Sequence, residues 1–137
     1  MNKKYQRYIE YIVNDIELPY IKSIEQYGLK QDECVLVLSK VFNQPVSIDG
    51  DHVYGQNGKL TYIEKSNGYW YKQEYDDNGN RIYTEYSDGD WVKYEYDTNG
   101  NEIYFEDSNG YWYKQEYDSN GKLIYQENSN GYIRDNR

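Results

Sequence analysis

Residues able to act as a nucleophile or a general base are scarce in this sequence. Its 137 residues include one histidine, His52, and one cysteine, Cys34. Cys34 falls on the apolar stripe of a predicted helix, where a small buried side chain is expected. His52 lies in a turn-rich segment with no serine or cysteine beside it, so the nucleophile and base of a hydrolase cannot be assembled. We therefore expect a protein that is not an enzyme.

Acidic turns are the second feature that could do chemistry. The DDNG turn at residues 76–79 has the composition of a calcium loop, and Asp97 and Asp118 recur in register with its first residue. An EF-hand loop needs D-x-[DN]-x-[DN]-G followed by a distant glutamate, whereas glycine here follows asparagine directly. Aspartate and asparagine also favour turns by accepting hydrogen bonds from nearby backbone N–H groups. We expect neither a metal site nor a bound cofactor.

Three helices are predicted before residue 45. Apolar residues recur at three- and four-residue intervals over 5–16, and Pro19 ends that element. A short helix fits 20–27, and a third fits 31–42 with acidic residues near its positive end. Combined with the strands predicted after it, this helical segment at 1–45 indicates an α+β fold.

Residues 46–137 form a tandem repeat with a period of 21 residues. A degenerate copy spans 53–65, three full copies span 66–86, 87–107 and 108–128, and a stub spans 129–137. Each full copy has two glycine turns, S-[ND]-G and D-x-N-G, between two runs of alternating aromatic and polar residues. This pattern predicts β-hairpins, and therefore an antiparallel meander sheet of hairpin repeats after the helices.

The odd period restricts the turns, because each residue must return to the same face of the sheet after one repeat. A four-residue loop at 76–79 and a three-residue loop at 87–89 satisfy this condition. Tyr71 then lies on one face, called the Tyr face, and Trp70 lies on the other, called the Trp face. The Tyr face is also predicted to carry Tyr69, Gln73, Tyr75, Ile82, Thr84, Tyr86, Val92, Tyr94, Tyr96, Ile103, Phe105, Tyr111, Tyr113, Tyr117 and Ile124. The Trp face is predicted to carry Lys72, Glu74, Arg81, Tyr83, Glu85, Trp91, Lys93, Glu95, Tyr104, Glu106, Trp112, Lys114, Glu116 and Tyr125. We expect the helices to cover the Tyr face of the first two hairpins.

Charge divides the chain at the same boundary. Residues 1–45 contain six Lys or Arg and six Asp or Glu, so the net charge of −9 resides in residues 46–137. A negative surface repels nucleic acid and attracts proteins with basic surfaces. The third predicted helix offers only Lys40 as a cation, which argues against a DNA-reading helix. No segment resembles a signal peptide or a membrane span, so we expect a cytoplasmic protein without membrane contact.

The repeats carry three resemblances. The YEYDTNGNEIY segment at 94–104 is similar to the YD repeats of Rhs-type and teneurin proteins, which implies hairpin units. The GYWYKQEYDSNG segment at 110–121 resembles aromatic cell-wall-binding repeats, which implies that Trp and Tyr of adjacent hairpins hold choline or glycans. The NGYWYKQEYDxNGN phrase resembles small proteins encoded by bacteriophages and mobile elements, which implies a phage origin and the host cytosol as location.

These features together predict a non-enzymatic acidic protein that binds and inhibits a host protein with a basic surface. A nucleic-acid cleft would be blocked in the manner of anti-CRISPR or anti-restriction proteins, either with carboxylates in place of phosphates or without mimicry. The residues expected to meet the partner are Trp70, Trp91, Trp112, Tyr94, Tyr96, Tyr111, Tyr113, Tyr117, Glu74, Glu85, Glu95, Glu106 and Glu116. Two alternatives remain: an aromatic-repeat module for glycans, choline or nucleobases, and a structural protein that self-assembles, for example as a dimer through the Tyr face.

Overall fold

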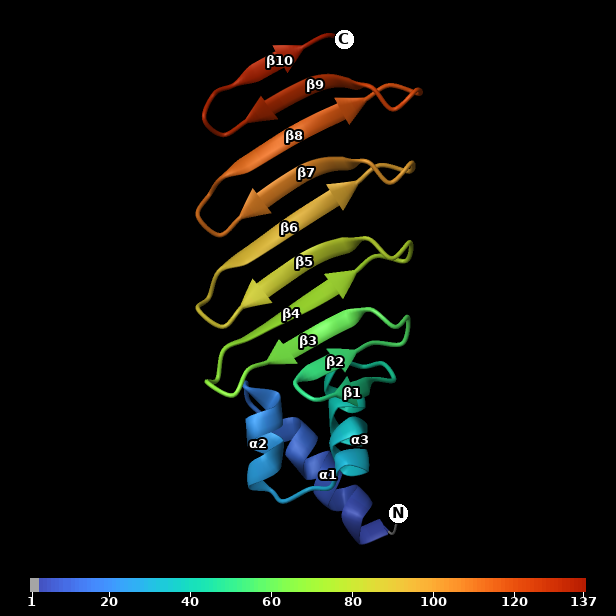
Figure 1. Ribbon diagram of the computed structural model, residues 1–137, viewed down its shortest axis with the longest axis vertical. Coiled ribbons are helices and arrows are strands. Elements are labelled where there is room, and N and C mark those ends of the chain that lie inside the picture. The colour runs from blue at the N-terminus through green and yellow to red at the C-terminus, as the bar shows by residue number, and fades with distance from the viewer. Residues whose placement is uncertain (1–2) are drawn as a thin grey trace. The chain divides into compact units, whose positions relative to one another are not determined.

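The computed structural model of the chain describes residues 3–137, which form three helices followed by an antiparallel sheet (Figure 1). The helices are α1 (Lys3–Asp15), α2 (Tyr20–Gln26) and α3 (Gln31–Val41). The strands are β1 (Ser47–Asp49), β2 (His52–Tyr54), β3 (Leu60–Glu64), β4 (Trp70–Tyr75), β5 (Arg81–Tyr86), β6 (Trp91–Tyr96), β7 (Glu102–Asp107), β8 (Trp112–Tyr117), β9 (Leu123–Asn128) and β10 (Ile133–Asp135). Their order in the open sheet is their order in the chain. The predicted α+β fold, with helices first and a hairpin meander after them, is confirmed.

The hydrophobic core lies in the first of two compact units, which comprise Met1–Tyr71 and Lys72–Arg137. Apolar residues of the three helices pack there against β2 and β3. The buried members of this core are Ile9, Ile12, Ile24, Val37, Leu38, Val46, Val53 and Tyr62. Trp70, the first residue of β4, packs against the same core, with its ring centroid 6.3 Å from that of Tyr62.

The helices pack against the Trp face of the first hairpins. Val53 and Tyr62 are paired in register, so both point to the side of the sheet on which Tyr62 meets Trp70. Ile63 points to the opposite side, and although it is buried it does not belong to the helix-packed core. The expectation that the helices cover the Tyr face is therefore wrong. The reason lies in the degenerate repeat, where Val53 occupies the position of Glu74 in the next copy and makes this part of the Trp face apolar.

Both turns of the repeat have three-residue loops. At the D-x-N-G turn the N–H of Asp76 donates to the carbonyl of Asn80 (2.9 Å), and at the other turn Tyr86 and Asp90 make the same bond (2.8 Å). The third loop residue is a glycine in the left-handed region, as at Gly89 with φ of 94°. The four-residue loop predicted at 76–79 is therefore wrong.

A β-bulge, instead of a longer loop, accommodates the odd period. Glu95 pairs with Tyr104, but the next residue, Tyr96, pairs with Glu102, which leaves Ile103 as an extra residue in β7. β9 has the same irregularity at Ile124. A bulge of this kind inserts one residue into one strand and keeps both flanking segments in register.

The bulge changes the face of the sheet on which the first residue after a D-x-N-G turn lies, from the Trp face to the Tyr face. Arg81 was predicted for the Trp face, yet its guanidinium donates to the hydroxyl of Tyr94 (3.3 Å) and lies 5.2 Å from that ring's centre. Glu102 likewise accepts a hydrogen bond from Tyr113. Arg81 and Glu102 therefore belong to the Tyr face, whereas Ile103, which was predicted for that face, is the unpaired bulge residue.

Candidate functional site

His52 and Cys34 form no nucleophile–base pair within residues 3–137. His52 Nδ1 is hydrogen bonded to the carboxylate of Asp51, and its ring stacks on that of Tyr54, 6.1 Å between centroids. Cys34 packs at the edge of the core, where burial, followed by the carboxylate of Glu25, raises the pKa of its thiol. The thiol is therefore held in its protonated form, which is not the nucleophilic one.

The aspartates of the D-x-N-G turns hold the loop backbone. Asp97 Oδ1 accepts the N–H groups of Asn99 and Asn101, both at 2.9 Å, and the hydrogen bond from Asn101 is the main cause that lowers the pKa of this carboxyl. Asp118 makes the same pair of contacts one repeat later. No group of three or more His, Cys, Asp or Glu able to hold a metal occurs in the described part of the chain. These carboxylates make Asx turns.

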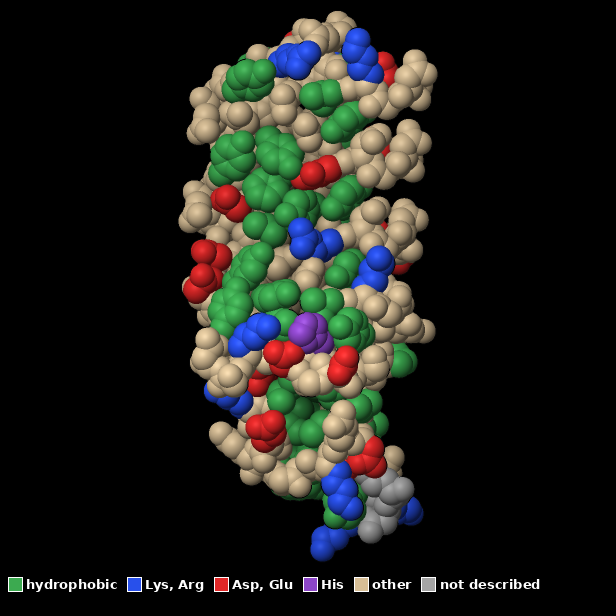
Figure 2. All heavy atoms as spheres, in the orientation of Figure 1, with side chains coloured by type: hydrophobic (Ala, Val, Ile, Leu, Met, Phe, Trp, Pro, Cys, Tyr) green, Lys and Arg blue, Asp and Glu red, His purple; other side chains and the backbone are tan. Residues whose placement is uncertain are grey.

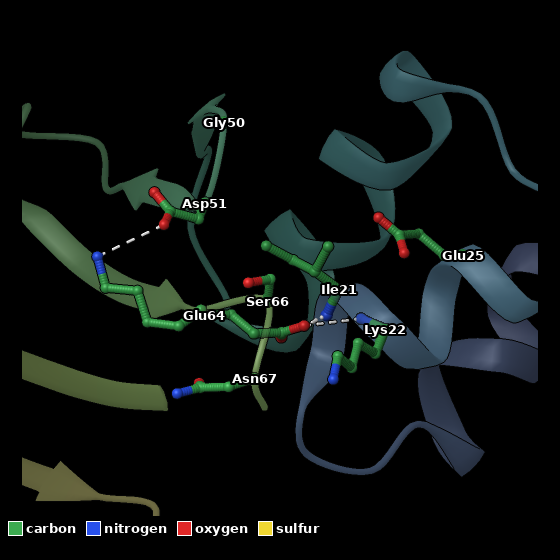
Figure 3. Close-up of a pocket in the computed structure, with 9 residues that line it drawn as sticks. Ile21, Lys22, Glu25, Gly50, Asp51, Glu64, Ser66 and Asn67 are labelled. Atoms are coloured by element: carbon green, nitrogen blue, oxygen red, sulfur yellow. Dashed lines mark hydrogen bonds and ion pairs between the residues drawn. The ribbon is translucent and has the colours of Figure 1, made fainter. Parts of the chain in front are cut away.

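A hollow of about 650 Å³ lies beside the start of α2 (Figure 3). Within it the carboxylate of Glu64 accepts the backbone N–H groups of Ile21 and Lys22, each at 2.8 Å, and the hydroxyl of Tyr62 at 2.6 Å. Glu64 is only 4% exposed. Three donors occupy its oxygen atoms, so the carboxylate has a structural role and fastens α2 to β3.

The Tyr face of the second unit carries a row of aromatic rings. Tyr94, Phe105 and Tyr113 lie on successive strands, with centroid separations of 5.3 and 5.1 Å. Tyr111 extends the row at 6.2 Å from Phe105. Figure 2 shows the face that bears the single histidine, His52, and hydrophobic side chains gather on it along the strands. This row is a partly exposed aromatic surface.

Polar groups border the aromatic row. Arg81 lies over the outer ring of Tyr94, in the geometry of a cation–π contact. At the other end, burial and then the hydrogen bond to Glu102 raise the pKa of Tyr113. The hydroxyl of Tyr113 therefore remains a hydrogen-bond donor at neutral pH.

The three tryptophans of the Trp face have different environments. Trp70 packs against the core of the first unit, whereas Trp91 and Trp112 lie in the second. Nζ of the lysine two residues later lies over each of these two rings, 4.7 Å from the centre of Trp91 and 5.3 Å from that of Trp112. The tryptophans therefore repeat in sequence but do not form three equivalent binding platforms.

A second row on the Trp face consists of tyrosine–glutamate pairs, of which Glu85 and Glu106 were among the predicted site residues and the tyrosines were not. In each repeat a tyrosine hydroxyl donates to the glutamate two residues later: Tyr62 to Glu64 (2.6 Å), Tyr83 to Glu85 (3.1 Å), Tyr104 to Glu106 (3.3 Å) and Tyr125 to Glu127 (2.8 Å). Alternation along a strand places side chains two residues apart on one face, which allows this bond. The phrase Y-x-E at the repeat period is the sequence signal that could have found it.

The predicted partner-binding residues divide between the two faces. The Trp face carries Trp91, Trp112, Glu74, Glu85, Glu95, Glu106 and Glu116, and the Tyr face carries Tyr94, Tyr96, Tyr111, Tyr113 and Tyr117. Glu85 is ion-paired with Lys72 (3.4 Å) and Glu116 with Arg137 (3.2 Å). Among the residues that the structure describes, Glu74 and Glu95 make no ion pair. A flat partner can contact only one of these two sets.

Fold and surface together define an α+β protein built on hairpin repeats with one aromatic and one acidic face. The chain matches no protein-family model and no curated protein sequence. None of the helices in the described residues has the length and apolar character needed to cross a bilayer.

Proposed function

We propose that this protein is a non-enzymatic binding protein whose repeat sheet engages a partner protein with a basic surface. The second unit carries this proposal. Lys72–Arg137 contains seven Lys or Arg and fifteen Asp or Glu, and no hydrophobic side chain in that range is buried. Half-exposed rings gain burial when a partner covers them, and the negative charge favours a cationic partner.

The proposed partner is a host protein that handles nucleic acid or acts in defence, and binding would block its nucleic-acid cleft. Such clefts attract phosphates through Lys and Arg, and an acidic sheet is complementary to them. Glu74 and Glu95, which lack ion pairs within residues 3–137, supply free carboxylates one repeat apart. Because Lys93 lies between them in sequence and on the same face, we propose overall charge complementarity instead of phosphate-by-phosphate mimicry.

The test is inhibition of DNA cleavage by a panel of restriction nucleases and CRISPR effectors, with binding measured at low and high salt. Binding that weakens with salt is expected. The double substitution Glu74→Lys and Glu95→Lys is expected to weaken binding by at least about tenfold. The matched control reverses two exposed turn charges, Asp77→Lys and Asp88→Lys, and is expected to have a smaller effect. Equal effects of the two pairs, or none from either, would contradict the proposal.

A second candidate is a module that binds amine ligands through tryptophan. The lysine ammonium groups over Trp91 and Trp112 favour it, because they show that these rings accept a cation. Titration with choline, followed by Trp fluorescence in a Lys93→Ala variant, tests it. An unchanged spectrum would remove this candidate.

A further inference from the structure

The last hairpin holds an arginine side chain on its Trp face. Cζ of Arg137 lies 4.0 Å from the centre of the Tyr125 ring. Its two terminal nitrogen atoms lie 3.2 Å from Glu116 and 3.0 Å from Asp135. Glu116 and Asp135 are the register partners of Tyr125 on the two adjacent strands. The guanidinium is therefore stacked on an aromatic ring and bound at its edge by carboxylates, the arrangement that suits a planar cation.

We call the tyrosine ring and the carboxylate paired with it in register a platform. The same platform recurs one repeat earlier. Tyr104 occupies the position of Tyr125, and Glu95 is its register partner as Glu116 is that of Tyr125. One further repeat back the equivalent residues are Tyr83 and Glu74. All four line one open groove of about 960 Å³. No arginine or lysine of the described chain forms an ion pair with either of these glutamates.

The first copy of the repeat does not form this platform. The register partner of Tyr62 is Val53, which stands where Tyr104 has Glu95, so the carboxylate is missing there. Of the three copies that have the tyrosine and the glutamate, the one at Tyr125 is occupied by Arg137. The two inner copies, at Tyr83 and Tyr104, open into the groove.

A lysine distinguishes each inner platform from the occupied one. Lys93 is the register partner of Tyr83 on β6 and also lines the groove, and Lys114 is that of Tyr104 on β8, where Tyr125 has Asp135 on β10. Nζ of Lys114 lies 5.3 Å from the Trp112 ring centre, so this ammonium group is directed to the tryptophan. An inner platform therefore offers one carboxylate fewer than the outer one, and we expect weaker binding there.

We propose that the platforms at Tyr83 and Tyr104 are arginine-binding subsites that take two arginine side chains from one segment of the partner. Equivalent positions are two strands apart, about 10 Å. A segment in the polyproline II conformation has three residues per turn and advances about 3.1 Å per residue, so arginines three residues apart point to the same side and match this spacing. The proposal rests on the proposed function and adds the chemistry of recognition: a planar guanidinium in preference to a point charge.

Two peptides test the subsites directly: Arg-Gly-Gly-Arg and Lys-Gly-Gly-Lys, each acetylated and amidated, with affinities measured by calorimetry or NMR. The arginine peptide is expected to bind at least about fivefold more tightly. Glu95→Gln and Tyr104→Leu are expected to abolish this preference, whereas Asp77→Asn, which removes the same charge from an exposed turn, is expected to retain it. Lys114→Asp copies the outer platform and is expected to raise affinity at least about threefold. Equal binding of the two peptides, or equal loss in Glu95→Gln and Asp77→Asn, would overturn the proposal.

Arg137 provides a second test that does not depend on weakening a site. Arg137→Ala vacates the platform at Tyr125, and the affinity for Arg-Gly-Gly-Arg-Gly-Gly-Arg is expected to rise at least about threefold. Arg134→Ala makes the same charge change at an exposed residue of β10 and is expected to have a smaller effect. Equal gains in the two variants would count against the subsites. If a protein partner still bound in a salt-dependent way after such a result, the proposed function would be retained and only the subsites would be rejected. The two proposals can therefore fail separately.

Discussion

The hydrogen bonds of Glu64 allow a quantitative prediction about the first unit. Its carboxylate serves three donors at 2.6–2.8 Å and is 4% exposed, so solvent screens these bonds little. Glu64→Gln leaves one carbonyl oxygen for three donors and brings an NH2 group against the others. A hydrogen bond to a charged acceptor contributes about 1.5–3 kcal/mol. The bond from Lys22, the one donor on Oε2, is lost, and the bonds from Ile21 and Tyr62 to Oε1 lose the charge of their acceptor. Because the neutral amide costs less to bury, we expect the free energy of unfolding to fall by about 3 kcal/mol.

The assay is urea unfolding followed by the fluorescence of Trp70, the tryptophan that packs against this core. Trp91→Phe and Trp112→Phe in the background remove the signals of the second unit. With a urea dependence of about 1–1.5 kcal/mol per molar for a unit of this size, the midpoint is expected to shift by about 2 M or more.

The repeat provides a matched control for this prediction. Glu106 occupies the position of Glu64 two periods later, and its carboxylate accepts one hydrogen bond, from Tyr104 at 3.3 Å. Glu106→Gln, measured with Trp91 and Trp112 retained so that their fluorescence follows the second unit, is therefore expected to cost less than about 1 kcal/mol. If the two substitutions changed the free energy of unfolding by the same amount, the reasoning that Glu64 anchors α2 would be refuted.

Three further outcomes are expected. Burial and the hydrogen bond to Glu64 raise the pKa of Tyr62. The stability that this group contributes is therefore full below pH 10 and is lost as the pH rises above 10. In urea unfolding at increasing alkaline pH, the Tyr62→Phe variant should lose less free energy of unfolding than the unsubstituted protein. Phe105→Ala removes three ring contacts from the Tyr face and should cost about 2 kcal/mol in urea unfolding. A change below about 0.5 kcal/mol would contradict the structural role of the row. Gly100→Ala places a side chain at φ of 83°, and no atom lies within 4 Å of the new Cβ. The substitution should therefore cost about 1–2 kcal/mol in thermal unfolding, all of it from the backbone conformation. Thr98→Ala in the same turn should leave the stability nearly unchanged.

The positions of the helices and strands were predicted well because apolar spacing and turn residues depend on neighbouring residues in the chain alone. Apolar spacing, Pro19 and Gly28 gave the helices within a few residues, and paired turn signals gave the hairpins. The faces of β6 and β8 follow from simple alternation and agree with the observed register. The bulge at Ile103 escaped prediction because an extra residue in the loop and an extra residue in the strand give the same repeat length. Only the hydrogen-bond geometry of the turn decides between them.

To predict which face the helices cover, and where the inner platforms lie, one must know which residues are paired across neighbouring strands. The first copy carries apolar residues on both faces, including Ile63 and Tyr62, so composition alone did not show which face takes the helices. Val53 in place of a glutamate was the informative difference. For the site, residue types selected Glu95 but not Tyr104, because tyrosine is so abundant here that its presence beside a glutamate carries little information without the register.

The bulge also determines how the repeat array can change in length. Each 21-residue copy begins and ends on the same face because the bulge compensates for its odd length. An in-frame duplication or deletion of one copy therefore yields a longer or shorter sheet with every later side chain still on its original side. The last three copies also share no buried core that a change in copy number would disrupt. Unequal recombination between neighbouring copies would therefore add or remove one hairpin repeat at a time, and the length of the sheet would change in steps of 21 residues.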